Sequence, residues 1–249
     1  MLSIDPKFEM RRAKLVSVAK CISFIGTKSC NGEFASATAF FICPVTLLTA
    51  GHVVPDNSMT VIAQLPGKQQ AYMDVEGLFE DNPPVEVLHC RHRYSMDCAD
   101  GDLAVLECID QDFKATQWVE LNRKKLKTDL GVDILGYPGA YGPEYVIRTH
   151  DEAVSANPTE NRKVSELLPT CTLTVSHGPV LTGVPRPAYR LSTIAGMSGS
   201  PVIVDGKAAG TLRLALSHLQ VFTMGAKTLK IVARRSRKTL SGISWRITA

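Results

Sequence analysis

The chain has 249 residues and a formal net charge of +4, with 45% hydrophobic and 21% charged residues. These values exclude a disordered charged tail and leave enough apolar residues for a sizeable core, in one all-β domain or in two lobes that share a cleft. No apolar run approaches the roughly 18 residues that a bilayer requires, so we expect no membrane-spanning helix.

Residues 1–14 are interpreted as an N-terminal extension. They carry charges where a secretory signal peptide needs an unbroken apolar stretch, so we expect an intracellular, cytoplasmic protein. From residue 15 to 112, short β-branched runs alternate with Gly, Pro, Asn and Asp, which favours antiparallel strands. The strands expected in this first lobe are Val16–Gly26, Ser36–Cys43, Thr60–Leu65, Tyr72–Phe79, Val85–Cys90 and Leu103–Cys108.

Residues 113–130 are rich in Lys, Asp and Gln and are interpreted as the connection between two lobes. A second series of strands follows within residues 131–224. Its expected members are Val132–Tyr137, Tyr145–His150, Thr170–Ser176, Tyr189–Thr193, Pro201–Val204 and Ala208–Leu214. The sequence therefore predicts an all-β fold.

Residues 225–249 form a basic C-terminal segment, in which we expect a short helix over Lys227–Leu240 with one apolar side. No acidic residue follows Asp205, whereas nine Lys and Arg residues do, so residues 206–249 carry a charge of +9. Such a segment indicates either a nucleic-acid or acidic surface contact through residues 227–246, or a solvated end without a partner.

The seven cysteines are an odd number, which argues against a disulfide framework in a chain without a secretory signal. Cys43 and Cys108 lie in apolar runs, where a free thiol acts as a small hydrophobic side chain. Cys90 and Cys98 lie near His89 and His92, but their spacing matches no common zinc pattern. We therefore expect no metal ion.

Three short segments carry residues with catalytic chemistry. In the first, the apolar run Leu47–Thr49 is followed by small residues and delivers His52 at its tip, as a general base on a rigid strand end requires. In the second, Asp102 directly precedes an apolar strand. A carboxylate drawn out of water there needs a partner, which favours Asp102 over the nearby Asp97 and Asp100 as the group that orients the histidine.

The third segment, Gly196-Met197-Ser198-Gly199-Ser200, places a serine between two glycines. Glycines permit a tight turn, so that the backbone N–H groups of Gly196 and Ser198 can converge on one oxyanion. The order His52, Asp102, Ser198 puts the first two residues in the first lobe and the serine in the second. We therefore expect a site between the lobes.

These segments resemble the signature blocks of chymotrypsin-like (trypsin-like) serine peptidases: Thr49-Ala50-Gly51-His52, Asp102-Leu103-Ala104-Val105-Leu106 and Gly196-Met197-Ser198-Gly199-Ser200-Pro201. The stretches VDILGYPG at 132–139 and DGKAAG at 205–210 are similar to the HtrA-like intracellular branch, and similar blocks occur in proteases of RNA viruses. The resemblance covers roughly residues 15–215. It implies two antiparallel six-stranded β-barrels and a serine endopeptidase that cleaves polypeptides through an acyl-enzyme on Ser198, without a cofactor.

The resemblance also implies which residues line the primary substrate pocket, namely Ser192, Thr193, Gly210, Thr211, Leu212 and Arg213. Because Ser192 carries no charge, we expect a small or medium apolar substrate residue rather than Lys or Arg; Arg213 would instead favour an acidic one.

The chain departs from the secreted members at Val53 and Ile194, where they carry cysteines, and at Met197, where they carry an aspartate that pairs with a newly cut N-terminus. We therefore expect activity without N-terminal processing. Two other functions remain open: an inactive protease-fold module for binding or signalling, and a nucleic-acid-binding protein that uses its basic C-terminus.

Overall fold

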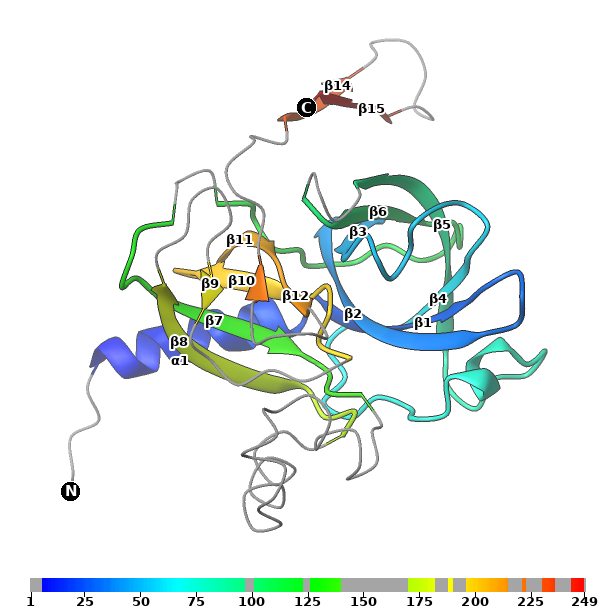
Figure 1. Cartoon of the computed structure of the whole chain (residues 1–249), viewed down its shortest axis with the longest axis horizontal. Helices are drawn as coiled ribbons and strands as arrows, with labels where there is room; N and C mark the ends of the chain where they lie inside the picture. Colours follow the sequence, from blue (N-terminus) through cyan, green and yellow to red (C-terminus); the bar gives the residue numbers. More distant parts are fainter. Residues whose placement is uncertain are drawn as a thin grey trace.

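Antiparallel strands in two lobes make up most of the described structure, a computed structural model that covers residues 6–96, 101–122, 126–139, 170–181, 188–189, 196–214, 221–222, 230–235 and 243–248. In Figure 1 the first lobe, coloured blue to green, lies beside the second lobe, coloured green to orange. The predicted all-β fold with two antiparallel lobes is confirmed.

The first lobe is a closed barrel with the strand order β1-β2-β3-β6-β5-β4. Closure pairs both edges of every strand, so the barrel exposes no free edge. Ile25, Phe41, Leu47 and Leu106 are fully buried in its interior. The strands are β1 (Ile22–Lys28), β2 (Phe34–Cys43), β3 (Thr46–Thr49), β4 (Thr60–Gln64), β5 (Val87–Met96) and β6 (Leu103–Cys108).

The second lobe is a five-stranded sheet with the order β11-β10-β7-β8-β9, which is open within the described residues. A short pair, β12 (Arg213–Leu214) and β13 (Val221–Phe222), follows it in the chain. The expected strand Tyr145–His150 lies outside the described residues. The five strands are β7 (Gly131–Gly136), β8 (Thr174–Leu181), β9 (Ala188–Tyr189), β10 (Pro201–Val204) and β11 (Lys207–Thr211).

A helix, α1 (Pro6–Ala19), stands where we expected an extension over residues 1–14 and a strand from Val16. The first part of the expected strand Val16–Gly26 is therefore wrong. Pro6 suits the first turn of a helix, and the Lys, Glu, Arg, Ala and Leu residues that follow favour the helical state. Among the described residues no helix is long and apolar enough to cross a membrane.

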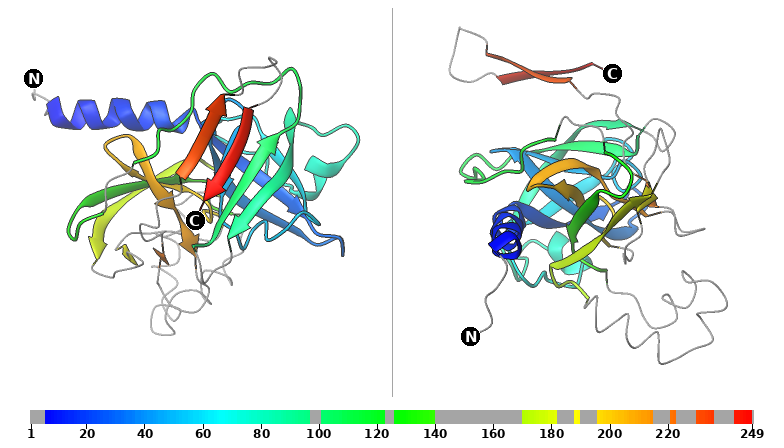
Figure 2. Two further views of the ribbon diagram at one scale, coloured as in Figure 1. Left: turned by 90° about the horizontal axis from the view of Figure 1, so that it is seen from above. Right: turned by 90° about the vertical axis from the view of Figure 1, so that its left-hand side faces the viewer.

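Helix α1 packs against the second lobe, and Figure 2 shows it running along that side of the molecule. Arg11 forms an ion pair with Asp133 on β7, and Lys14 Nζ lies 3.9 Å from the carboxylate of Asp205. Val18, at the end of the helix, is 4% exposed and belongs to the main core. These contacts with residues distant in the chain stabilise the helix beyond what its own sequence provides.

Two further sequence predictions are wrong. The expected strand Tyr72–Phe79 is replaced by a 3₁₀ turn, η1 (Glu76–Phe79), because the Asp74 side chain accepts a hydrogen bond from the Gly77 N–H and bends the chain. The expected helix over Lys227–Leu240 is replaced by strand β14 (Lys230–Arg235), paired with β15 (Ile243–Thr248). Ile, Val, Trp and Thr in these segments favour strands when a partner strand is present.

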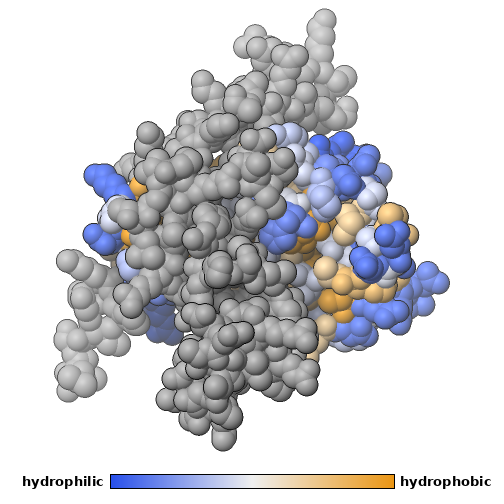
Figure 3. Space-filling model, in the orientation of Figure 1, coloured by the Kyte–Doolittle hydropathy of each residue, from blue (hydrophilic) through white to orange (hydrophobic). Residues whose placement is uncertain are grey.

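One hydrophobic core joins the two lobes. It contains Phe24 and Phe40 from the first lobe and Leu135 and Tyr137 from the second, all buried. The rings of Phe24 and Tyr137 meet edge to face, with centroids 5.9 Å apart. By contrast, Figure 3 shows mostly hydrophilic residues, with smaller apolar areas between them, on the visible face of the first lobe.

We expect Phe24→Ala to destabilise both lobes together, because it removes a fully buried ring from the core that they share. The free energy of unfolding should fall by about 3–5 kcal/mol, measured by urea denaturation. Met73→Ala, at a side chain that is half exposed, is the control and should change this free energy by less than about 0.5 kcal/mol. Two separate transitions, with only one shifted by Phe24→Ala, would contradict a shared core.

Candidate active site

His52 is held close to Asp102 because the end of β3 and the following Gly51 pack against Met96 and Leu103. Strand β3 pairs with β6, with Thr49 opposite Ala104, and the chain then turns through Gly51 to His52. A Cβ atom at Gly51 would lie 2.2 Å from the carbonyl oxygen of Met96, so only glycine allows this close approach. The turn before His52 therefore rests on the segment that carries Asp102.

The Asp102 carboxylate is almost fully buried and is bound twice by His52. Its Oδ1 accepts a hydrogen bond from the His52 backbone N–H at 2.7 Å, and its Oδ2 lies 2.8 Å from His52 Nδ1. The residue is 3% exposed, so these bonds offset the cost of removing a charge from water. A proton on Nδ1, donated to the carboxylate, leaves Nε2 free to accept a proton on its other side.

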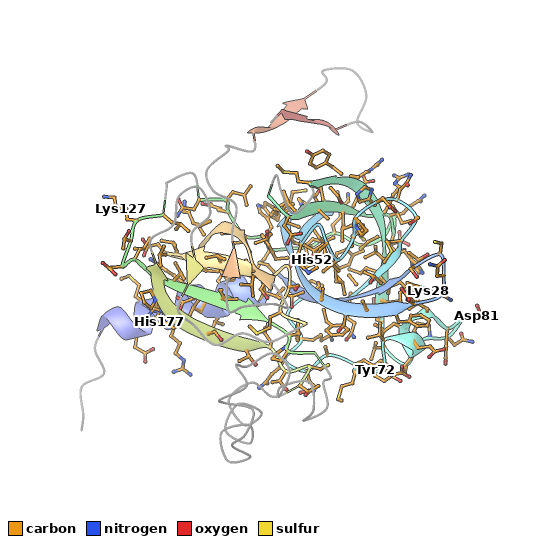
Figure 4. All side chains as sticks on the ribbon, viewed as in Figure 1. Lys28, His52, Tyr72, Asp81, Lys127 and His177 are labelled. Carbon is orange, nitrogen blue, oxygen red and sulfur yellow. The ribbon has the colours of Figure 1, made fainter. Side chains whose placement is uncertain are left out.

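Ser198 lies on that other side. Its Oγ is 3.1 Å from His52 Nε2, within hydrogen-bonding distance. The serine comes from the second lobe, in the turn before β10, whereas His52 comes from the first lobe, and Figure 4 shows His52 near the boundary between the two. The structure therefore brings the three predicted residues together, in the order Asp102, His52, Ser198. Asp97 and Asp100 lie outside the described residues.

The turn that carries Ser198 packs directly on the barrel of the first lobe. Gly199 has a φ of +84°, and a Cβ atom there would lie 2.2 Å from both the Thr38 carbonyl oxygen on β2 and the Thr49 hydroxyl on β3. The Thr38 N–H also donates a hydrogen bond to the Ser198 carbonyl oxygen at 2.9 Å. These contacts place the serine at a defined distance from the histidine on the neighbouring segment.

Met197 lies in the core of the second lobe. It is fully buried and belongs to the same apolar cluster as Val202 and Leu212. This is the position at which the secreted peptidases carry an aspartate. Its buried side chain therefore packs beneath the turn that carries Ser198.

The other predicted site residues are described only in part. Gly196 is buried with a φ of +90°, which suits a glycine in a tight turn. Thr211 and Leu212 are buried beside the serine turn, where the Leu212 carbonyl oxygen accepts a hydrogen bond from the Gly199 N–H. Gly210 is partly buried on β11. Ser192, Thr193 and the side chain of Arg213 lie outside the described part of the chain, so the predicted pocket stays a prediction.

Sequence reasoning missed Thr38, which connects the site to both lobes. Its hydroxyl donates a hydrogen bond to the Gly196 carbonyl oxygen at 3.0 Å and accepts one from the Tyr137 N–H at 3.0 Å. The only signal in the sequence is a threonine within the apolar run of β2. A buried polar residue there must have partners, but the sequence does not identify them.

The described cysteines are free thiols, and most of them are buried. Cys90 and Cys108 are buried in the barrel, and burial raises the pKa of the Cys21 and Cys171 thiols to about 11. Such thiols stay protonated and pack as small hydrophobic groups. Within the described ranges, no three His, Cys, Asp or Glu residues lie close enough to hold a metal ion.

Comparisons with known proteins concern the family and the fold of the chain. A family model described as Trypsin matches residues 20–218. No curated protein matches the chain. Among solved structures, Deg5 is 12% identical with a TM-score of 0.56, covering 89% of this chain and 91% of that one. The active form of the Rv3671c protease from M. tuberculosis is 18% identical with a TM-score of 0.55, covering 90% and 84%. At these identities the likeness concerns the fold.

We expect Gly51→Ala to disrupt the site by steric conflict, because the new methyl group would collide with the Met96 carbonyl oxygen. Urea denaturation should show a loss of at least about 3 kcal/mol in the free energy of unfolding. Gly32→Ala is the matched control: that glycine has a φ of +82° but no atom within 4 Å of the added Cβ, so the loss should be only about 1 kcal/mol. Equal losses at the two positions would argue against close packing at Gly51.

Proposed function

Since the chain belongs to the trypsin family, we propose that it is a serine endopeptidase that hydrolyses polypeptides through an acyl-enzyme on Ser198. The observation that carries the proposal is the position of His52, with one ring nitrogen 2.8 Å from the Asp102 carboxylate and the other 3.1 Å from the Ser198 hydroxyl. A serine hydroxyl is a weak nucleophile until a neighbouring base removes its proton.

The roles follow from the chemistry of each group. Ser198 Oγ attacks the scissile carbonyl carbon while its proton passes to His52 Nε2, and the peptide carbonyl becomes an oxyanion. His52 then returns the proton to the leaving amine, and water hydrolyses the acyl-enzyme by the same two steps in reverse. Asp102 holds the His52 ring in the required tautomer and stabilises the imidazolium that forms. No step requires a metal or an organic cofactor.

The oxyanion is assigned to the backbone N–H groups of Gly196 and Ser198, because these amides belong to the turn that carries the nucleophile. A single donor of this kind contributes about 3–4 kcal/mol to the stability of the transition state. Thr211 and Leu212, beside the same turn, are assigned to one wall of the substrate pocket. The Leu212 side chain is buried in the core, and its backbone N–H and carbonyl oxygen bond to Ser200 and Gly199, which fixes this wall against the serine turn.

The alternative of a catalytically inactive protease-fold module would require a blocked or dismantled site. The buried position of Met197 supports activity, since this side chain packs in the core of the second lobe instead of covering the serine. The short distances among the three catalytic candidates support it as well, because they need no further movement of the chain before proton transfer.

We expect a fluorophosphonate probe to label the full chain, because it reacts with an activated serine, and to leave Ser198→Ala unlabelled. Asp102→Asn should slow labelling by about 10⁴-fold, because the amide favours the wrong tautomer of His52. Labelling is measured by intact-protein mass spectrometry over time. Ser58→Ala, at an exposed serine whose backbone N–H bonds to the Asp56 carboxylate, is the control and should label like the wild type. A folded wild-type chain without any labelling would overturn the proposed activity.

We expect activity without cleavage of the N-terminus, because Met197 offers no carboxylate to a new α-amino group. A chain with an acetylated N-terminus should react with the probe at the same rate as the unmodified chain. Mass spectrometry reports both the intact N-terminus and the label on one molecule. Labelling confined to N-terminally truncated molecules would contradict this expectation.

A further inference from the structure

Thr38 is fully buried on β2, and each of its polar groups bonds to a different part of the site. Its N–H donates to the Ser198 carbonyl oxygen at 2.9 Å, and its carbonyl oxygen accepts from the Thr49 hydroxyl at 2.8 Å. Its own hydroxyl donates to the Gly196 carbonyl oxygen and accepts from the Tyr137 N–H, both at 3.0 Å. The residue therefore joins the strand that leads to His52 with two segments of the second lobe.

The direction of the Thr38 side chain follows from the pleat of β2. Successive side chains of a strand point to opposite faces. Ala37, Ala39 and Phe41 face the interior of the first barrel, whereas Phe40 belongs to the core shared with the second lobe. Thr38 lies two residues before Phe40, on the face toward the second lobe. From this face the Thr38 hydroxyl reaches the Gly196 carbonyl oxygen.

The bond to Gly196 constrains a residue that has wide conformational freedom. Without a side chain, glycine populates positive and negative φ about equally, so its neighbouring peptide groups can rotate easily. The Gly196 carbonyl belongs to the peptide group that joins Gly196 to Met197, which lies between the Gly196 and Ser198 N–H groups in the chain. By holding this oxygen, the Thr38 hydroxyl fixes that peptide plane and limits the rotation of the turn that carries both N–H groups. These two N–H groups are the donors assigned above to the oxyanion.

We propose that the Thr38 side chain is a positioning residue for oxyanion binding, which holds the Gly196–Met197 peptide, and with it the turn that carries both N–H donors, from across the boundary between the lobes. The inference rests on the proposed function, because it assigns a role within that reaction. Thr38 touches neither the substrate nor the reacting atoms, and it acts through Gly196. Its backbone bond to Ser198 O needs only a backbone N–H, which every residue except proline has, whereas the bond to the Gly196 carbonyl oxygen requires a side-chain hydroxyl.

The test compares variants of the full chain by saturation kinetics with the fluorophosphonate probe, which separate the maximal labelling rate kinact from the half-saturating concentration KI. Thr38→Val keeps the shape of the side chain and removes the hydroxyl. We expect kinact to fall about 10- to 100-fold, because a misplaced amide weakens stabilisation of the developing charge. KI should change by less than about threefold. Thr38→Ser, which keeps the hydroxyl, should retain kinact within about threefold of the wild type.

Thr27→Val is the matched control for loss of a buried hydroxyl without contact with the site. Thr27 is fully buried on β1, and its hydroxyl bonds within the barrel to the Ala35 carbonyl oxygen. This variant should lower the melting temperature and leave kinact unchanged. A purely structural role for Thr38 would give the same result in Thr38→Val, with reduced melting temperature and normal kinact in the folded fraction, and would overturn the inference.

Failure of the inference differs from failure of the proposed function. If the wild type is labelled and Thr38→Val is labelled at the same kinact, the positioning role is wrong and the peptidase proposal stands. If the folded wild type is not labelled at all, the peptidase proposal is wrong and the positioning role falls with it. Should Thr38→Val fail to fold, the inference requires kinact of Thr38→Ser to exceed that of Thr38→Ala by about tenfold or more.

Discussion

The contact between the turn at residues 196–200 and strand β2 governs the geometry of the whole site, because the nucleophile and its base belong to different lobes. Gly199 allows the backbones to approach so closely that a single added carbon would overlap the Thr38 carbonyl oxygen. Hydrogen bonds from Thr38 to Ser198 and Gly196 fix the same contact in direction as well as distance. The two lobes are also held together by the aromatic contact of Phe24 with Tyr137 and by the core that they share.

A buried carboxylate sets the electrostatic requirement of the site. Asp102 is almost completely removed from water, a state that is unfavourable for a charge unless hydrogen bonds replace the lost hydration. His52 supplies two of these bonds, one from its backbone and one from its ring. The same bonds that stabilise the carboxylate also determine which ring nitrogen faces Ser198. The stability of the buried carboxylate and the proposed proton transfer therefore depend on the same bonds between His52 and Asp102.

Apolar packing and ion pairs stabilise the second lobe and the helix that packs on it. Met197 fills the second-lobe core at the place where secreted members carry an aspartate. Helix α1 is held against the second lobe by the ion pair of Arg11 with Asp133 and by burial of Val18. The described cysteines are free thiols, four of them buried, so packing rather than disulfides stabilises the described part of this fold.

The sequence alone determined the all-β class, many of the strands and the three residues that meet at the site. Those features are local: β-branched runs predict strands, and a short motif marks each candidate residue. Tertiary structure decided the rest, including helix α1 in place of an extension and the start of a strand, and strand β14 in place of a helix. Contacts with Asp133 and Asp205 stabilise α1, and pairing with the following strand β15 stabilises β14 as a strand. Thr38 could not be recognised from the sequence because its importance lies in hydrogen bonds to Gly196 and Tyr137, roughly 100 or more residues away. Only the folded chain brings those partners to the same threonine.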